Sequence, residues 1–372
     1  MLATWHSLFI FSRRKAPPNP ARILITHHLR LGDTLMLTPL LAKLREQYPL
    51  AEIVMTTPKA IVPLYEKRPY GVLAIPYDPR DPATLQTLFK LRGFDLAIVP
   101  GDNRNSWLAR ALGAKWIIAH AADRPAYKNW PVDQLLPYSS KPAAWGDMVA
   151  ALVPGNAPAA YDPQAWPAPG FAPFALPQSP YCVLHVGASS PLKFWDNAKW
   201  LALAAHLNHQ GYNIVWSGGP GEQELIDAID PEERYPSYAD QFDLPQLWNL
   251  VNKASLLVCP DTGVAHIGRL TNTPTVTLFG PGSASIYGAG DFWRNSPYRA
   301  VTVENFPCRN QQQLFKRQIS WVFRCARTIN ECPSAACMKA ITLNEVINVA
   351  STLLNTSQNH SNATPTQDSQ HV

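Results

Sequence analysis

The chain has 372 residues, of which 46% are hydrophobic and 16% are charged, a composition typical of folded globular proteins. Its length is sufficient for two domains of ordinary size. The formal net charge of +5, from 32 Lys and Arg against 27 Asp and Glu, is too small for a nucleic-acid-binding surface. Such a mild excess suits an anionic substrate or an anionic membrane face, and solubility alone explains it equally well.

The N-terminal residues 1–12 are fairly apolar and are followed by Arg13, Arg14 and Lys15. A signal peptide carries its basic residues before the apolar stretch, so secretion is not expected. No run of 18 or more apolar residues is present, so no membrane-spanning helix is expected either. Residues 1–19 are predicted to be a flexible segment, with a short interfacial anchor as the alternative. The protein is therefore expected to be cytoplasmic, with peripheral contact to a membrane face as the alternative.

The first half of the chain alternates apolar strands with helical patterns. Residues 21–28 are predicted to form a buried strand, and residues 51–57 and 94–100 two more. Continuous apolar strands separated by helices indicate a parallel sheet that is covered on both faces. Residues 20–165 are therefore predicted to form a Rossmann-like domain.

The same pattern begins again after a proline-rich stretch. Residues 166–180 lack periodicity and are predicted to link two domains, and residues 181–355 are predicted to form a second Rossmann-like domain. Residues 356–372, rich in Ser, Asn, Gln and Thr, are predicted to be disordered. The fold class is thus α/β, with two doubly wound domains facing a central cleft. Sheets of this kind bind ligands at the carboxyl ends of their strands.

Two loops that follow predicted strands of different domains carry polar residues suited to chemistry. The loop after the first strand holds Asp33, which either caps the following helix or projects a carboxylate into the cleft. A loop of the second domain holds Ser189, Ser190 and Lys193. A lysine in this position can bind a phosphate as a point charge.

Two further loops of the second half surround predicted helix starts. Residues 217–222, ending in Glu222, are rich in glycine but match neither GxGxxG nor a P-loop, so alone they are a weak signal. Residues 260–266 include Asp261, Thr262 and Gly263 at a helix start, whose backbone amides suit a diphosphate. A helix cap is the alternative for this turn, and His266 either faces the ligand or packs.

The four loops, in this order, resemble those of the glycosyltransferase family nine heptosyltransferases. The matching segments are residues 31–53, 186–204, 215–224 and 260–282, with LGD and PDTG-AH the most specific in combination. The resemblance covers roughly residues 20–350. It implies a GT-B arrangement of two Rossmann-like domains. It also implies ADP-heptose as donor, bound by the C-terminal domain, and the inner core of lipopolysaccharide as acceptor.

The resemblance also implies roles for individual residues. By position, Asp33 matches the catalytic base and Lys193 the lysine that contacts the donor diphosphate. The other donor-binding residues implied are Ser189, Ser190, Glu222, Asp261, Thr262, Gly263 and His266. Direct attack of a sugar hydroxyl on the anomeric carbon would invert its configuration. His27, His28 and Leu29 replace small hydroxyl residues of some members, which leaves the acceptor open.

No cofactor and no catalytic metal are expected, because Lys193 and the helix start can meet the negative charge of the leaving group. Four cysteines near the C-terminus have spacings that fit no zinc pattern well, so unlinked thiols are predicted and a structural metal is the alternative. These four are Cys308, Cys325, Cys332 and Cys337. Cys182 and Cys259 are predicted to be buried in strands.

The partners expected are a nucleotide-sugar donor and an anionic glycolipid acceptor, with peripheral membrane contact and no nucleic acid. One alternative keeps the transferase and changes the acceptor to a protein or another polysaccharide. Another is a non-catalytic nucleotide-sugar-binding module on the same scaffold.

Overall fold

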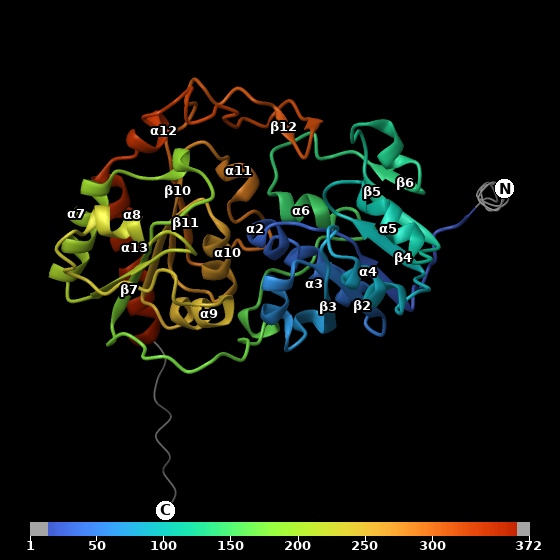
Figure 1. Ribbon diagram of the computed structural model, residues 1–372, viewed down its shortest axis with the longest axis horizontal. Helices are drawn as coiled ribbons and strands as arrows, with labels where there is room; N and C mark the ends of the chain where they lie inside the picture. The colour runs from blue at the N-terminus through green and yellow to red at the C-terminus, as the bar shows by residue number, and fades with distance from the viewer. Residues whose placement is uncertain (1–13, 363–372) are drawn as a thin grey trace, which may run out of the picture. The chain divides into compact units, whose positions relative to one another are not determined.

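The computed structural model describes residues 14–362, which form two compact units (Figure 1). Within the described residues, unit 1 comprises residues 14–160, 164–169 and 312–322. Unit 2 comprises residues 161–163, 170–311 and 323–362. The segment 312–322, here named the clasp hairpin, is therefore part of unit 1 although the chain around it belongs to unit 2.

Unit 1 is built on a six-stranded parallel sheet with the order β3-β2-β1-β4-β5-β6. The strands are β1 (Arg22–Ile25), β2 (Glu52–Thr57), β3 (Val72–Pro76), β4 (Leu96–Val99), β5 (Trp116–His120) and β6 (Gln134–Leu136). This is the strand order of dinucleotide-binding Rossmann domains, whose topological switch point lies between β1 and β4. The predicted Rossmann-like character of the first half is confirmed.

Helices cover this sheet, because its central strands are apolar on both faces. All four residues of β4 are buried, and Leu24 of β1 packs in a common core with Ala97 and Ile117. The α-helices of unit 1 are α2 (Leu31–Leu35), α3 (Thr38–Gln47), α4 (Pro82–Phe89), α5 (Asn105–Ala111) and α6 (Trp145–Ala150). Its 3₁₀ turns are η2 (Lys59–Tyr65), η3 (Pro69–Gly71), η4 (Ala126–Asn129) and η5 (Pro163–Ala165), the last straddling the boundary between the units.

Unit 2 is built on a five-stranded parallel sheet with the order β11-β10-β9-β7-β8. The strands are β7 (Tyr181–His185), β8 (Asn213–Ser217), β9 (Leu256–Pro260), β10 (Thr275–Phe279) and β11 (Tyr298–Thr302). Numbered from β7, this is the other common doubly wound order, in which the switch point lies between β7 and β9. The loops after these two strands carry Lys193 and Asp261, which the sequence predicts to bind the donor.

The helices of unit 2 begin where the sequence supplies capping groups. Asp196 accepts hydrogen bonds from the amides of Ala198 and Lys199 at the start of α7. Asp243 and Gln246 form a capping box on α9. The helices are α7 (Asn197–His209), α8 (Gln223–Ile229), α9 (Leu244–Asn252), α10 (Gly263–Leu270), α11 (Ala284–Tyr287), α12 (Ala336–Lys339) and α13 (Leu343–Asn362), with a 3₁₀ turn η6 (Pro191–Lys193).

The structure differs from the predicted domain boundaries by a few residues around the predicted linker, where residues 161–163 belong to unit 2 and residues 164–169 to unit 1, and more clearly at the hairpin and at the tail. The clasp hairpin, with strands β12 (Gln313–Leu314) and β13 (Arg317–Gln318), lies within the range 181–355 predicted for the second domain but belongs to unit 1. The buried side chains of Leu314 and Arg317 explain this, since Arg317 bonds to groups of unit 1.

The predicted start of the disordered tail, residue 356, also lies too early in the chain. Helix α13 continues to Asn362, past residue 356, because Val346, Ala350 and Leu353 bury one face of it in unit 2 and polar residues extend the same helix. Residues 1–13 of the predicted flexible segment, including any anchor there, and residues 363–372 lie outside the described residues. In the part of the chain that is described, no helix is both long and apolar enough to cross a membrane.

Candidate active site

Lys193 and Asp261 meet at the carboxyl edge of the unit 2 sheet. The Nζ atom of Lys193, at the end of η6, donates to the carbonyl oxygen of Asp261 at 2.6 Å and to its carboxylate Oδ2 at 3.1 Å. Lys193 follows β7 and Asp261 follows β9, so the contact spans the switch point of the sheet. Both side chains are largely buried, at 22% and 10% exposure. The structure therefore brings together two residues predicted to bind the donor.

In the turn at the start of α10, one residue caps the helix and its neighbour pairs with Lys193. Thr262 is the N-cap, and its hydroxyl accepts a hydrogen bond from the amide of Val264 at 3.1 Å. The Asp261 carboxylate is therefore left for Lys193, and it packs so closely on Gly282 that a side-chain carbon there would overlap it. Gly263 is the first residue of the helix. Helix starts of this kind favour anions.

The serines predicted in the donor loop take different positions. Ser190 caps the short η6 turn, with its hydroxyl accepting from the amide of Leu192 at 3.3 Å. Ser189 is exposed to solvent. Ser190 thus shapes the backbone that carries Lys193, whereas Ser189 presents a hydroxyl at the surface of the loop.

Glu222 lies where two glycine-containing loops meet. Its Oε2 atom accepts a hydrogen bond from the amide of Gly219, in the loop after β8, at 2.5 Å. The same carboxylate lies over Gly187, in the loop after β7, so closely that a side-chain carbon at Gly187 would collide with it. Carboxylates in this region of doubly wound sheets accept hydrogen bonds from ribose hydroxyls. Glu222 is half-buried, and these two loops fix the position of its carboxylate.

His266 is buried and bonded through Nδ1 to the Arg269 guanidinium. A guanidinium only donates, so this Nδ1 accepts and the proton of the neutral ring is on Nε2. Burial holds the pKa of His266 well below its ordinary value, and the charges of Arg269 and Lys193 lower it further. His266 is therefore a neutral side chain close to Lys193. The guanidinium of Arg269 lies 4.9 Å from the ring centre of Trp293.

Asp33 belongs to unit 1, unlike the other predicted site residues. Helix α2 has Arg30 at its N-cap position, so Asp33 lies in the first turn rather than at the cap. The side chain is half-buried. It is close to Tyr138: burial raises the pKa of Tyr138 to about 12, and the carboxylates of Asp123 and Asp33 contribute in the same direction, while Arg317 opposes them.

Several contacts near these residues escape prediction from sequence. Burial lowers the pKa of His27 to about 3, and its Nδ1 accepts from the amide of Leu29 at 3.2 Å. Tyr138 stacks on His120 with ring centres 3.8 Å apart. Arg269 is the exception that a sequence signal could have found, because it follows His266 by one helical turn.

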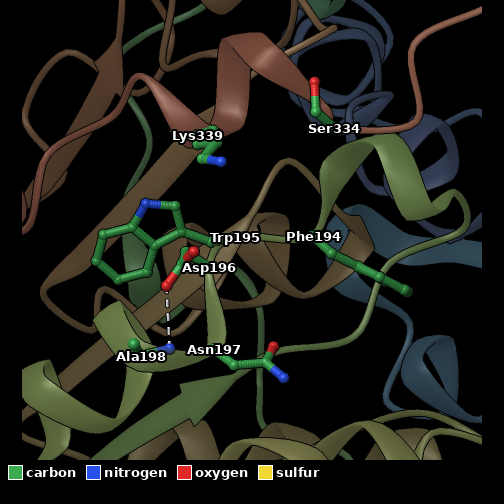
Figure 2. A pocket seen from close by; sticks show the side chains of 7 residues that line it. All are labelled: Phe194, Trp195, Asp196, Asn197, Ala198, Ser334 and Lys339. Atoms are coloured by element: carbon green, nitrogen blue, oxygen red, sulfur yellow. Dashed lines mark hydrogen bonds between the residues drawn. The ribbon is translucent and has the colours of Figure 1, made fainter.

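A cavity of about 530 Å³ opens beside the start of α7 in unit 2, and Figure 2 shows the side chains around it. None of the predicted donor-binding residues lines it. The Asp196 carboxylate accepts from the amide of Ala198 (dashed in Figure 2) and from that of Lys199. This helix start is thus already capped. The lining residues are Phe194, Trp195, Asp196, Asn197, Ala198, Ser334 and Lys339.

All six cysteines are free thiols, and Cys182 and Cys259 are buried in β7 and β9 as predicted. Burial raises the pKa of the Cys308 thiol, and the neighbouring thiol of Cys325 raises it further. Within residues 14–362, no three His, Cys, Asp or Glu side chains are grouped in a way that could hold a metal ion. Whether the C-terminal cysteines bind a structural metal, the alternative to unlinked thiols, stays untested.

The chain is similar to proteins of one known family. Residues 157–318 match the model of glycosyltransferase family 9 (heptosyltransferase). Lipopolysaccharide heptosyltransferase 3 of Escherichia coli K12 is 24% identical over 321 residues, which cover 78% of this chain and 91% of that protein. Another Escherichia coli lipopolysaccharide heptosyltransferase 3 is 33% identical over 105 residues, 27% of this chain, and there the match spans only 31% of the relative's length.

The solved structure of Escherichia coli ADP-heptose lps heptosyltransferase II has a TM-score of 0.69 to this chain at 19% identity, covering 91% of this chain and 99% of that one. A family 9 glycosyltransferase from Veillonella parvula also has a TM-score of 0.69 at 20% identity, covering 90% and 98%. At these identities the likeness shows the fold, and it confirms the predicted GT-B fold of two Rossmann-like domains. Together with the family match over residues 157–318, the conclusion is that the chain is a glycosyltransferase similar to the heptosyltransferases of family 9.

Proposed function

We propose that the chain moves heptose from ADP-heptose to a hydroxyl of the lipopolysaccharide core, or of a related surface glycan, with inversion at the anomeric carbon. The names of its relatives support this, because they are lipopolysaccharide heptosyltransferases and one is named for ADP-heptose. The observation that carries the proposal is the Lys193 ammonium held by Asp261 beside the start of α10.

The leaving group of this reaction is ADP, whose diphosphate gains negative charge as the bond to the sugar breaks. A lysine ammonium has three N–H donors, and two of the directions around Lys193 are taken by oxygens of Asp261. The third is directed at a phosphate oxygen in the proposed complex. The N-terminal amides of α10 add partial positive charge, so fixed donors stabilise the departing diphosphate without reorganising.

The acceptor hydroxyl is a poor nucleophile and needs a base within hydrogen-bond reach. We assign this role to Asp33, which lies in the first turn of α2 rather than at its cap. As the acceptor oxygen bonds to the anomeric carbon, the bond from that carbon to the ADP oxygen breaks and its electron pair leaves with ADP. The hydroxyl proton passes to the Asp33 carboxylate, and attack from the opposite side inverts the centre.

The experiment is calorimetric titration with ADP-heptose, UDP-sugars and GDP-sugars, followed by transfer assays on a panel of truncated core glycolipids. We expect ADP-heptose to bind best and one glycolipid to accept heptose, with an inverted anomeric centre by NMR. Tighter binding of a UDP- or GDP-sugar contradicts the donor assignment and leaves the transferase class intact. Donor binding without transfer to glycolipid, protein or polysaccharide would instead favour a binding module.

Peripheral membrane contact is part of the proposal, because the acceptor is a glycolipid. Unit 1 exposes three aromatic side chains on neighbouring segments: Trp107 on α5 and Tyr127 and Trp130 in and after η4, at 45%, 44% and 73% exposure. The indole of Trp107 donates to the carbonyl oxygen of Tyr127 at 3.2 Å, which joins the two segments. Arg104 and Arg124 are exposed on the same segments. Amphipathic rings beside cationic groups suit an anionic lipid interface.

Sedimentation with vesicles of phosphatidylethanolamine and phosphatidylglycerol tests this contact. Trp130→Ser should lower the bound fraction, and salt should lower it as well because part of the attraction is electrostatic. Leu50→Ser, which changes another exposed apolar side chain of unit 1 (97% exposed), should leave binding as in the wild type. Equal loss in both variants, or no binding by the wild type, contradicts the assignment of this surface.

A further inference from the structure

The clasp hairpin has an unusual turn. Its strands pair Leu314 with Arg317, so the two central residues are Phe315 and Lys316, with φ of 46° and 64°. Two-residue hairpin turns with positive φ at both positions normally use Asn-Gly, because side chains with a Cβ resist that conformation. Residues held in such a conformation persist where the surroundings determine it, and they cluster at functional sites.

Arg317 supplies the anchor that holds this turn. The side chain is 2% exposed. Its Nε donates to the carbonyl oxygen of Ala121 at 2.9 Å, and its Nη2 donates to Oδ1 of Asn103 at 2.8 Å. The carboxylate of Asp123 lies 3.4 Å from Nη2, and the guanidinium lies over the Tyr138 ring at 5.6 Å. Few groups other than a guanidinium could satisfy this set of partners, because the partners surround the planar guanidinium, whose N–H donors point in fixed directions.

The partners of Arg317 are themselves fixed. The backbone amide of Asn103 donates to Asp123 Oδ2 at 2.8 Å, and the buried Lys128 ammonium lies 3.4 Å from Asp123 Oδ1. A second anchor is the indole of Trp321, which donates to the carbonyl oxygen of Ser139 at 2.8 Å. The clasp hairpin is thus tied to the loops that follow β4, β5 and β6 of unit 1.

The tip of the clasp hairpin lies at the switch point of the unit 1 sheet. Phe315 packs on Trp145 with ring centres 4.9 Å apart. A side-chain carbon at Gly101 would lie 3.6 Å from the Phe315 ring and 3.1 Å from Leu29. Gly101 follows β4 and Leu29 follows β1, and these are the two strands between which doubly wound sheets bind ligands. Leu29 also leads directly into α2, which carries Asp33.

We propose that the clasp hairpin forms one wall of the acceptor site, with Phe315 packing against the acceptor sugar and Arg317 acting as the positioning residue that holds Phe315 there. This inference rests on the proposed function, because it assumes that the acceptor hydroxyl reaches Asp33. The ring suits a sugar, since the C–H groups of a pyranose face pack on the face of an aromatic side chain.

Packing within unit 1 leaves part of the Phe315 ring uncovered. The buried side chains that attach the hairpin are Leu314, Arg317, Ile319 and Val322, whereas Phe315 is only half-buried. The backbone of Phe315 is in a conformation that large side chains disfavour. Its ring is partly exposed beside the strand ends at which such sheets bind ligands, so the uncovered surface of the ring is available to an acceptor.

The test measures transfer from ADP-heptose to a truncated core glycolipid in Phe315→Ala, Phe315→Tyr and the control Phe323→Ala. Phe323 is 52% exposed, follows the hairpin in the chain and belongs to unit 2, so it matches the change in composition outside the proposed wall. We expect the acceptor KM to rise about tenfold in Phe315→Ala, to recover in Phe315→Tyr, and to stay normal in Phe323→Ala. The Kd for ADP-heptose should be the same in all four proteins, since the donor binds unit 2.

Arg317→Lys tests the positioning role, because lysine keeps the charge and loses the planar fork. Hydrogen exchange across residues 312–322 should become faster and the acceptor KM should rise as in Phe315→Ala, with the donor Kd unchanged. Faster exchange with a normal acceptor KM, or a normal KM in Phe315→Ala, overturns the hairpin proposal alone. Failure of the wild-type protein to bind ADP-heptose overturns the proposed function and this inference with it.

Discussion

The ammonium of Lys193 donates to both the carbonyl oxygen and the carboxylate of Asp261, so a single side chain joins the loops after β7 and β9. The Asp261 carboxylate is itself confined between Lys193 and Gly282. A cation that is already held in place loses little conformational freedom when a diphosphate binds, and this preorganisation favours the charged leaving group.

Replacing Lys193 with Ala should weaken ADP-heptose binding and slow transfer, because the diphosphate loses its cation. A hydrogen bond to a charged group contributes about 1.5 to 3 kcal/mol, which corresponds to a loss of roughly 10- to 150-fold in affinity. The melting temperature should also fall, since the largely buried Asp261 loses its partner. Calorimetry and differential scanning fluorimetry measure the two effects.

The matched control is Lys253→Ala, which removes an exposed lysine at the end of α9 in the same unit. It should change neither donor affinity nor melting temperature appreciably. Donor affinity and turnover that survive unchanged in Lys193→Ala would show that the donor loop has been placed wrongly.

The alternation of apolar strands and helices was enough to predict two doubly wound sheets, and the polar loops after the strands predicted where Lys193 and Asp261 would lie. Contacts across long sequence distances were out of reach. Arg317 bonds to Asn103 and Ala121, which lie 214 and 196 residues away in the chain, and no local pattern marks such a partnership. The end of α13 was missed for another reason: its last turns are polar, and only the packed stripe before them shows that the helix continues.

Transfer should continue in EDTA, because the proposed stabilisation of the leaving diphosphate comes from Lys193 and the start of α10. The assay compares initial rates in excess EDTA with rates after adding back Mg²⁺ or Mn²⁺. Activity that disappears on chelation and returns with either ion contradicts the mechanism. A structural metal at the C-terminal cysteines is a separate question, which elemental analysis of the purified protein answers.

His185 should make the stability of unit 2 depend on pH. Burial lowers its pKa to about 4 from an ordinary value of 6.5, so the folded state holds the neutral ring. Below pH 6.5 the unfolded chain binds a proton that the folded chain does not, and the free energy of unfolding falls by about 1.4 kcal/mol per pH unit. This contribution is fully present above pH 6.5 and is lost as the pH falls towards 4.

His185→Asn keeps a polar group near Ser217 but cannot titrate. Between pH 6.5 and pH 5, its free energy of unfolding should fall by about 2 kcal/mol less than that of the wild type. Chemical denaturation at several pH values gives the comparison. The exposed His209, changed to Gln, should follow the wild-type curve. Parallel curves for His185→Asn and the wild type would mean that this ring is not the titrating group.

Asp33→Asn separates an enzyme from a binding module. The substitution keeps the size of the side chain and removes its charge, so the fold should persist. Donor affinity should persist as well, because all the residues predicted to bind the donor lie in unit 2. If Asp33 accepts the proton of the acceptor hydroxyl, single-turnover transfer should fall by roughly 10²- to 10⁴-fold.

The control for this variant is Asp81→Asn in the same unit. Asp81 is a true helix cap, since its carboxylate accepts from the amide of Ala83 at 2.9 Å, whereas Asp33 lies inside the first turn of α2. Asn caps a helix about as well as Asp, so Asp81→Asn should transfer heptose at the normal rate. Melting temperature, donor Kd and single-turnover rate are measured on one preparation of each protein. A well-folded Asp33→Asn variant that binds donor and turns over like Asp81→Asn removes Asp33 from the chemistry, because loss of the charge would then have cost nothing at the step that needs a base.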